Sequence, residues 1–286
     1  MNTIKNFVWK FDYKKRRVEI RYLEEFSSER DFDQISSDLP QGVYTTFRTY
    51  DRNKALHLEE HIKRLEHSAK LMQKEIHLPR SPLHGVLSSI IEDFPAEGDL
   101  RFRLTVDLEE QLGMLYITAG HLQKPSPKDY QEGVKLVTWR LKRQMALAKR
   151  TNFISQAQKV RKLLPTDVHE ALMISPEGLL LEGLTSNFFA VYRGELYSAG
   201  EDILHGITRA LVLRASQMID LPVRLQSLFE HELPQVEEAF ITSSSRAILP
   251  VRQIDEIKPL FSVPGEKTRA LMVAFEDLLQ AELKQI

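Results

Sequence analysis

The chain has 286 residues, of which 42% are hydrophobic and 28% charged, the composition of an ordinary soluble protein. Its formal charge of −1 excludes the strong positive field expected of a protein that binds nucleic acid or an anionic membrane. The absence of cysteine excludes disulfides, thiolate metal sites and cysteine nucleophiles. The first residues lack the apolar run of a signal peptide, and no segment approaches the roughly 20 apolar residues of a membrane span. We therefore expect a cytoplasmic protein.

The first part of the chain carries both strand and helix patterns. Segments rich in β-branched and aromatic residues predict strands, and apolar residues that recur at the helical period predict helices. The predicted strands are residues 41–50, 100–106 and 113–118, and the predicted helices are residues 58–72 and 83–94, separated by Pro79. Residues 51–54 predict a turn after the first strand.

Residues 124–133 hold two prolines and one glycine but no apolar aliphatic side chain, which predicts a linker. After it, strands are predicted at 134–140, around 172, around 179, at 188–192 and at 239–242, and helices at 152–164, 208–219 and 268–283. Strands and helices do not alternate regularly, so the pattern favours an α+β protein. We predict a smaller N-terminal α/β domain (1–123), the linker, and a larger C-terminal domain (134–286).

Two short segments carry the chemistry. Lys149 stands three residues before Asn152, and Glu182-Gly183 is followed by Ser186-Asn187. A lysine amine can form a Schiff base with the aldehyde of pyridoxal 5'-phosphate, and a carboxylate can keep the pyridine nitrogen of that cofactor protonated. A single lysine is usually solvated, but Glu182 directly follows three leucines, where a buried carboxylate needs a partner.

These segments and their order resemble the class IV (fold-type IV) aminotransferase family. The resemblance implies a two-domain α+β architecture with pyridoxal 5'-phosphate in the interdomain cleft, and a homodimer. It assigns Lys149 as the catalytic Schiff-base lysine and Glu182 as the catalytic partner of the pyridine nitrogen. It also implies further cofactor-binding residues: Arg64, Ser186, Asn187, Ile207, Thr208, Ser243 and Ser244. Among these, Arg64, the helix-end amides of Ile207 and Thr208, and the serine hydroxyls suit a phosphate.

On the substrate side the resemblance implies Tyr44 and Arg101. The chain departs from the family pattern here, because Thr45 replaces a common glutamate and residues 107–110 lack a common Arg-Gly pair. A smaller departure is His205, where the family usually has proline. Arg140, Arg143 and Arg150 are interpreted as solvated or structural.

The resemblance implies an aminotransferase that moves an amino group between a small or branched apolar amino acid and a 2-keto acid. D-amino acid specificity stays open. Three partner classes are not expected: nucleic acid, a membrane, and a metal, since the nine histidines are scattered. The alternative is a 4-amino-4-deoxychorismate lyase, which releases pyruvate and 4-aminobenzoate with the same catalytic residues. A non-catalytic anion-binding protein would leave Lys149 and Glu182 unexplained.

Overall fold

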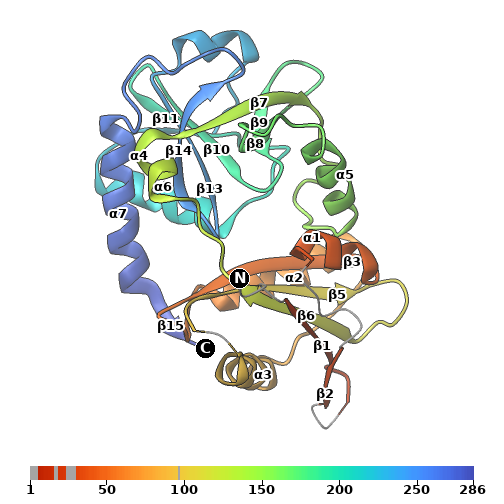
Figure 1. The fold of residues 1–286 in the computed structure, drawn as a ribbon. Helices are drawn as coiled ribbons and strands as arrows, with labels where there is room; N and C mark the ends of the chain where they lie inside the picture. Colours follow the sequence, from red (N-terminus) through yellow and green to blue (C-terminus); the bar gives the residue numbers. More distant parts are fainter. Residues whose placement is uncertain (1–5, 16–18, 24–29, 96) are drawn as a thin grey trace. The chain divides into compact units, whose positions relative to one another are not determined.

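The computed structural model describes residues 6–15, 19–23, 30–95 and 97–286 (Figure 1). The chain forms two compact units. Unit 1 contains Met1–Gln123, Ala148–Gln158 and Glu282–Ile286, and unit 2 contains Lys124–Leu147 and Lys159–Ala281. The units are therefore not two continuous halves of the chain, and the segment that carries Lys149 belongs to unit 1. The division into domains 1–123 and 134–286 stays a prediction.

Unit 1 is built on a seven-stranded antiparallel sheet in the order β15-β4-β3-β5-β6-β1-β2. Its strands are β1 (Phe7–Asp12), β2 (Glu19–Tyr22), β3 (Gly42–Tyr50), β4 (Lys54–Leu56), β5 (Leu100–Asp107), β6 (Met114–His121) and β15 (Leu283–Gln285). Its helices are α1 (Phe32–Asp38), α2 (Leu58–Leu71) and α3 (Arg80–Asp93).

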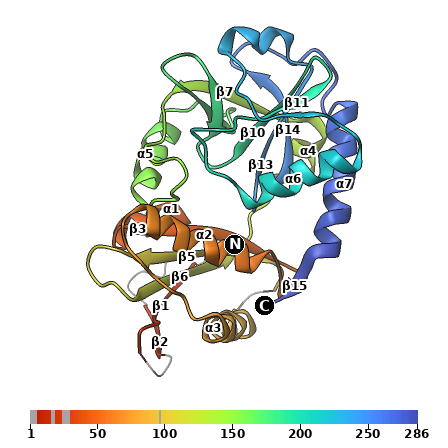
Figure 2. The same ribbon diagram turned by 180° about the vertical axis from the view of Figure 1, so that it is seen from behind.

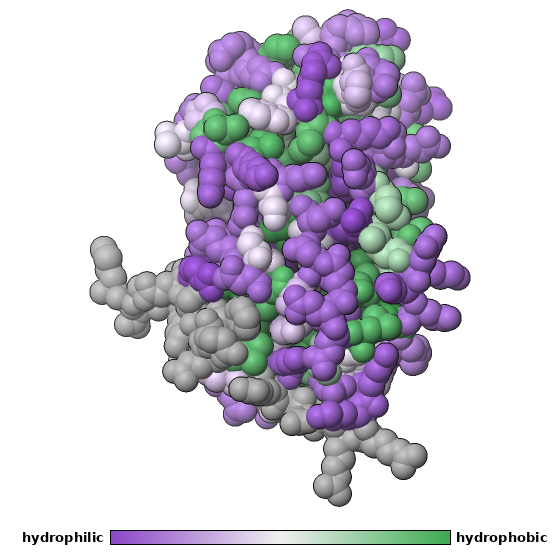
Figure 3. Space-filling view, turned by 90° about the vertical axis from the view of Figure 1, so that its right-hand side faces the viewer, coloured by the Kyte–Doolittle hydropathy of each residue, from purple (hydrophilic) through white to green (hydrophobic). Residues whose placement is uncertain are grey.

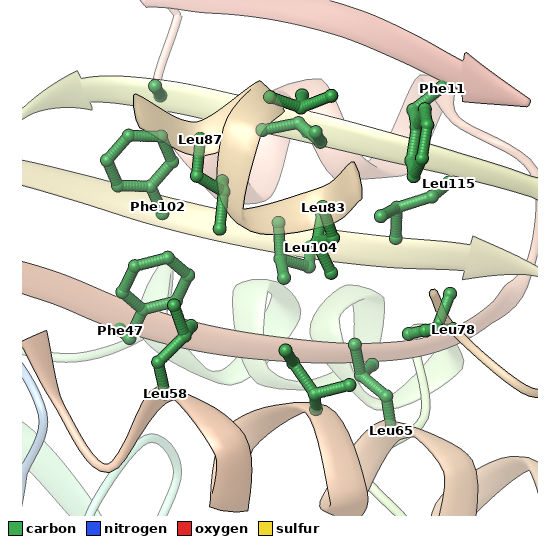
Figure 4. Packing of buried hydrophobic residues seen from close by; sticks show 14 of the residues in the cluster. Phe11, Phe47, Leu58, Leu65, Leu78, Leu83, Leu87, Phe102, Leu104 and Leu115 are labelled. Atoms are coloured by element: carbon green, nitrogen blue, oxygen red, sulfur yellow. The ribbon is translucent and has the colours of Figure 1, made fainter. Parts of the chain in front are cut away.

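The core of unit 1 lies between the sheet and the two helices α2 and α3, as Figure 4 shows. Side chains alternate along a strand, so every second residue of β3 and β5 faces these helices. Phe47 and Phe102 stack there with ring centroids 5.1 Å apart. Thr45 belongs to the same series on β3 and is fully buried. The other residues of β3 and β5, among them Tyr44 and Arg103, point to the opposite face.

Unit 2 is built on an eight-stranded mixed sheet in the order β12-β11-β10-β13-β14-β7-β8-β9. Its strands are β7 (Val134–Arg140), β8 (Glu170–Ile174), β9 (Leu180–Gly183), β10 (Asn187–Tyr192), β11 (Glu195–Tyr197), β12 (Val223–Arg224), β13 (Glu238–Ser243) and β14 (Ala247–Ile254). The remaining helices are α4 (Pro127–Glu132), α5 (Asn152–Arg161), α6 (Ile207–Met218), the 3-10 helix η1 (Glu230–Gln235) and α7 (Glu266–Glu282). Helix α6 packs against β13 (Figure 2), where Phe189 and Phe240 stack at 4.9 Å.

Most predicted elements are confirmed, and the mixed α+β class with them. Residues 127–132 of the predicted linker form α4, and the linker itself stays a prediction. Ser126 caps this helix through a capping box with Asp129, a short-range signal that the two prolines obscured. The helix predicted at 152–164 ends at Arg161. The elements β1, β2, α1, β4, β11, β12, η1, β14 and β15 were not predicted, and most of them are short. Short strands carry little periodicity and depend on their neighbours in the sheet.

The face drawn in Figure 3 is covered mostly by hydrophilic residues, with hydrophobic ones interspersed, as on ordinary protein surfaces. Within the residues that the structure describes, no helix is both long and apolar enough to cross a bilayer.

Candidate active site

The backbone around Lys149 is joined to the start of β3 within unit 1. The Lys149 carbonyl accepts a hydrogen bond from the Tyr44 amide at 2.9 Å, and the Lys149 amide donates to the Ser68 hydroxyl at 3.2 Å. Gly42 exchanges bonds with Thr151, whose amide donates to the Gly42 carbonyl and whose hydroxyl accepts from the Gly42 amide. A Cβ on Gly42 would lie 1.9 Å from a carbonyl oxygen of β5, so glycine is required. These contacts fix the main chain from which the lysine projects.

The structure brings Lys149 and Tyr44 together. Lys149 Nζ lies 5.0 Å from the centroid of the Tyr44 ring, and the guanidinium carbon of Arg103 lies at the same distance from that ring. A cation within about 6 Å of an aromatic face is attracted to it. Tyr44 is therefore held beside two cations, one on its own sheet and one on the Lys149 segment.

Arg103 was missed in the sequence, which pointed to Arg101 instead. Arg103 is 3% exposed, donates to Asp33 and Ser36 at 2.7 Å each, and donates to the Phe32 carbonyl at 2.9 Å. Arg101 places its guanidinium 4.7 Å from the Phe32 ring. The two arginines share one face of β5 because they are two residues apart. That spacing was the available signal for Arg103.

Arg64 lies on α2, facing β3. Its Nη2 donates to the Thr45 hydroxyl at 2.6 Å and lies 3.4 Å from His61 Nδ1. Burial, the nearby charges of Arg64 and Lys149, and a smaller effect of His57 hold the pKa of His61 well below its usual value. His61 is therefore neutral at physiological pH. The predicted phosphate-binding arginine thus stands in a buried polar cluster.

In unit 2, Glu182 occupies the end of β9 and is 2% exposed. Its Oε2 accepts hydrogen bonds from Asn187 Nδ2 at 3.2 Å and from the Leu204 amide at 3.1 Å. Its Oε1 lies 3.4 Å from Nε of Arg143, which is itself 6% exposed. Arg143 had been interpreted as solvated or structural; it is buried and paired with the predicted catalytic carboxylate.

Asn187 stabilises the turn that follows Glu182 through its side-chain hydrogen bonds. Besides Glu182, its Nδ2 donates to the Leu204 carbonyl at 2.8 Å. A Cβ on Gly206 would lie 2.2 Å from Asn187 Oδ1, and a Cβ on Gly183 would lie 2.3 Å from the Ser186 hydroxyl oxygen. Glycine is therefore needed at both positions for Asn187 and Ser186 to sit where they do.

Ser186 donates to the buried carboxylate of Glu170 at the start of β8. Glu170 also accepts bonds from the Thr185 amide at 2.7 Å and from Arg246 Nη1 at 3.0 Å. Burial alone would raise the pKa of Glu170, but Arg246 and the hydroxyls of Ser186 and Thr185 outweigh it and lower the pKa to about 2. Sequence reasoning missed Glu170 and Arg246, which lie 76 residues apart and lack a local signal.

We predict that Glu170 makes stability depend on pH. Its pKa falls from 4.5 to about 2 on folding, so its contribution is present above pH 4.5 and is lost as the pH falls towards 2. The shift corresponds to about 3 kcal/mol of unfolding free energy. Urea unfolding should therefore show a large difference between wild type and Glu170→Gln at pH 6 and less than half of that difference at pH 3. Glu195→Gln, which breaks an exposed pair with Arg224, is the control and should change little. A pH-independent difference for Glu170→Gln would contradict the prediction.

The start of α6 and the end of β13 supply further donors in unit 2. The N-cap of α6 is Gly206, so no side chain caps the first amides of this helix, those of Ile207 and Thr208 among them. Ser243 Oγ is buried, and no hydrogen-bond partner for it exists among the described residues. Ser244 follows in the turn between β13 and β14. Uncapped amides and a buried hydroxyl fit a phosphate group, as the cation of Arg64 does in unit 1.

The chain is similar to known proteins over most of its length. The family model for amino-transferase class IV matches residues 42–254. The chain is 27% identical to a "Probable branched-chain-amino-acid aminotransferase" of Thermotoga maritima, over 86% of this chain and 89% of that protein. It is 26% identical to a D-alanine aminotransferase of Bacillus licheniformis, over 92% and 96%. It is 24% identical to an aminodeoxychorismate lyase of Bacillus subtilis, over 82% and 84%.

A crystal structure of a protein from Thermotoga maritima superposes with a TM-score of 0.79 at 26% identity. The superposition covers 96% of each chain. The family match spans most of the chain and includes every residue that the sequence assigned to the site. The chain therefore belongs to the class IV aminotransferase family, whose enzymes use pyridoxal 5'-phosphate.

Proposed function

We propose that this enzyme transfers the amino group of a small or branched apolar amino acid to a 2-keto acid, through a Schiff base with Lys149. The observation that carries the proposal is the buried Glu182 carboxylate, with one oxygen held by two N–H donors on a glycine-dependent turn. Such a carboxylate suits a protonated pyridine nitrogen, because its charge and position are already in place.

When bound, pyridoxal 5'-phosphate supplies an aldehyde for the amine and a ring that accepts electrons from the substrate. Lys149 would hold the cofactor through its side-chain amine, and the same amine would move the proton at the substrate α-carbon. Glu182 would hold the ring nitrogen. Asn187 donates to the Glu182 carboxylate, and Ser186 ties the same turn to Glu170. The proposed phosphate-binding residues are Arg64, Ile207, Thr208, Ser243 and Ser244.

The substrate carboxylate is proposed to meet Tyr44 and Arg101. Arg103 orders the same face, since its own charge is paired with Asp33. Asp107 forms the turn that replaces the family's Arg-Gly pair, because its carboxylate accepts the amides of residues 109, 110 and 111 at 2.8–2.9 Å. An acidic turn here favours a donor with one carboxylate. The branched-chain names among the relatives support the same choice.

The substrate class is tested by the half-reaction. Enzyme loaded with pyridoxal 5'-phosphate is mixed with single L- and D-amino acids, and the conversion of the cofactor to pyridoxamine 5'-phosphate is followed by absorbance. We expect conversion with L-valine, L-leucine or L-alanine, and none with the matching 2-hydroxy acids, which lack the amine. L-Glutamate should react more slowly, because its second carboxylate meets the acidic turn.

Other outcomes of the half-reaction would change the proposed substrate or the proposed reaction. Conversion with D-amino acids alone would move the proposal to D-amino acid specificity. Failure of every amino acid, together with release of pyruvate from aminodeoxychorismate, would replace it with the lyase. A homodimer and a cytoplasmic location are further parts of the proposal, and sedimentation of the purified protein tests the first of them.

A further inference from the structure

Thr45 is a buried polar residue on the face of the unit 1 sheet that packs mainly apolar side chains against α2 and α3. Its hydroxyl oxygen lies 2.6 Å from Arg64 Nη2 and 2.8 Å from His61 Nδ1. Both partners come from α2, three residues apart and therefore on one side of the helix. A single hydroxyl on β3 thus connects two polar residues of α2, His61 and Arg64.

The direction of these hydrogen bonds follows from chemistry. A guanidinium has no acceptor, so the Thr45 oxygen accepts from Arg64, and the Thr45 proton is left to donate to His61. Arg64 Nη2 also points at His61 Nδ1, which must therefore be the acceptor nitrogen. His61 is 2% exposed, and burial, followed by the nearby charges of Arg64 and Lys149, lowers its pKa, so it is neutral with its proton on Nε2.

We propose that Thr45 is a positioning residue for Arg64, orienting its guanidinium for the cofactor phosphate through acceptors that carry no charge. The inference rests on the proposed function. The family pattern commonly has glutamate at this position, and a carboxylate within hydrogen-bonding distance of Arg64 would offset its positive charge. Thr45 and neutral His61 hold the same group without that offset. A phosphate dianion accepts charge-assisted hydrogen bonds from a guanidinium, and these are stronger than neutral ones.

The test measures ligand binding by the full-length apoprotein, without turnover. Each variant is titrated with pyridoxal 5'-phosphate and with pyridoxal, which has the aldehyde and ring but no phosphate. Competition by inorganic phosphate gives a second measure of the phosphate site. The variants are Thr45→Ser, Thr45→Val, Thr45→Glu and Arg64→Ala. Thr118→Val is the control, since Thr118 is also fully buried in this sheet but its hydroxyl has no partner among the described residues.

Thr45→Ser should bind pyridoxal 5'-phosphate like wild type. Thr45→Val should raise the Kd about 10-fold, the usual effect of losing one hydrogen bond to a charged group. Thr45→Glu should raise it further, towards the value of Arg64→Ala. The Kd for pyridoxal should change less than about 2-fold in all of them, because only the phosphate is affected. Thr118→Val should leave both constants unchanged.

The test distinguishes failure of this inference from failure of the proposed function. Wild-type protein that binds no pyridoxal 5'-phosphate would contradict the proposed function itself. If wild-type protein binds pyridoxal 5'-phosphate and Thr45→Val and Thr45→Glu bind it with the same affinity, the positioning role of Thr45 is contradicted and the proposed function is not. Equal weakening of pyridoxal and pyridoxal 5'-phosphate would show a general structural role. If Thr45→Val does not fold, Thr45→Ser and Thr45→Glu are compared instead. Equal affinity of these two variants for pyridoxal 5'-phosphate would contradict the positioning role of Thr45.

Discussion

Replacement of Lys149 by alanine is expected to abolish turnover while the protein stays folded. The side chain supplies both the covalent attachment of the cofactor and the proton carrier, and loss of the proton carrier alone costs roughly 10²–10⁴-fold. The fold should survive, because the hydrogen bonds of residue 149 to β3 and Ser68 are made by its main chain. Circular dichroism checks the fold, and the half-reaction checks the activity.

Borohydride reduction identifies the attachment point directly. Reduced wild-type protein should carry the cofactor on the peptide that contains Lys149, and Lys149→Ala should carry none. Lys159→Ala is the matched control, because Lys159 is an exposed lysine on the helix that follows, and it should label and react like wild type. Labelling of another lysine in wild-type protein would refute the assignment of Lys149.

Replacement of Glu182 by glutamine is expected to slow the half-reaction by roughly 10²-fold or more, the usual effect of removing one preorganised electrostatic partner. Glutamine keeps the size of the side chain and an oxygen that can accept from Asn187 and from the Leu204 amide. It removes the negative charge and leaves Arg143 beside a neutral amide. The measurement is a single-turnover rate at saturating cofactor, so that weaker cofactor binding does not enter.

Glu177→Gln is the matched control for Glu182→Gln. Glu177 lies in the turn between β8 and β9, is exposed, and should leave the rate unchanged. A rate for Glu182→Gln close to that of wild type would show that another group keeps the pyridine nitrogen protonated. A loss of folded protein in Glu182→Gln would instead indicate that the ion pair with Arg143 is chiefly structural.

Local sequence patterns determined the elements that place the site. The strand β3 and the helix α2 were predicted because β-branched residues and the helical period act over a few neighbouring residues. The glycines of the motifs also act locally. Gly183 and Gly206 lie where a side chain would collide with Ser186 or Asn187. The two segments around Lys149 and Glu182 could be recognised for the same reason, since each motif is continuous in the chain.

Only the tertiary structure decided what surrounds those motifs. Nothing local pairs Arg143 with Glu182, Arg246 with Glu170, or the Lys149 amide with Ser68, because each pair is separated by 39 to 81 residues. Arg103 and Arg101 look alike in sequence, and only packing against α1 distinguishes them. The chemistry of single side chains follows from residue type and short-range spacing. Their partners, charge states and burial follow from which distant strands and helices meet, and one sequence alone does not show that.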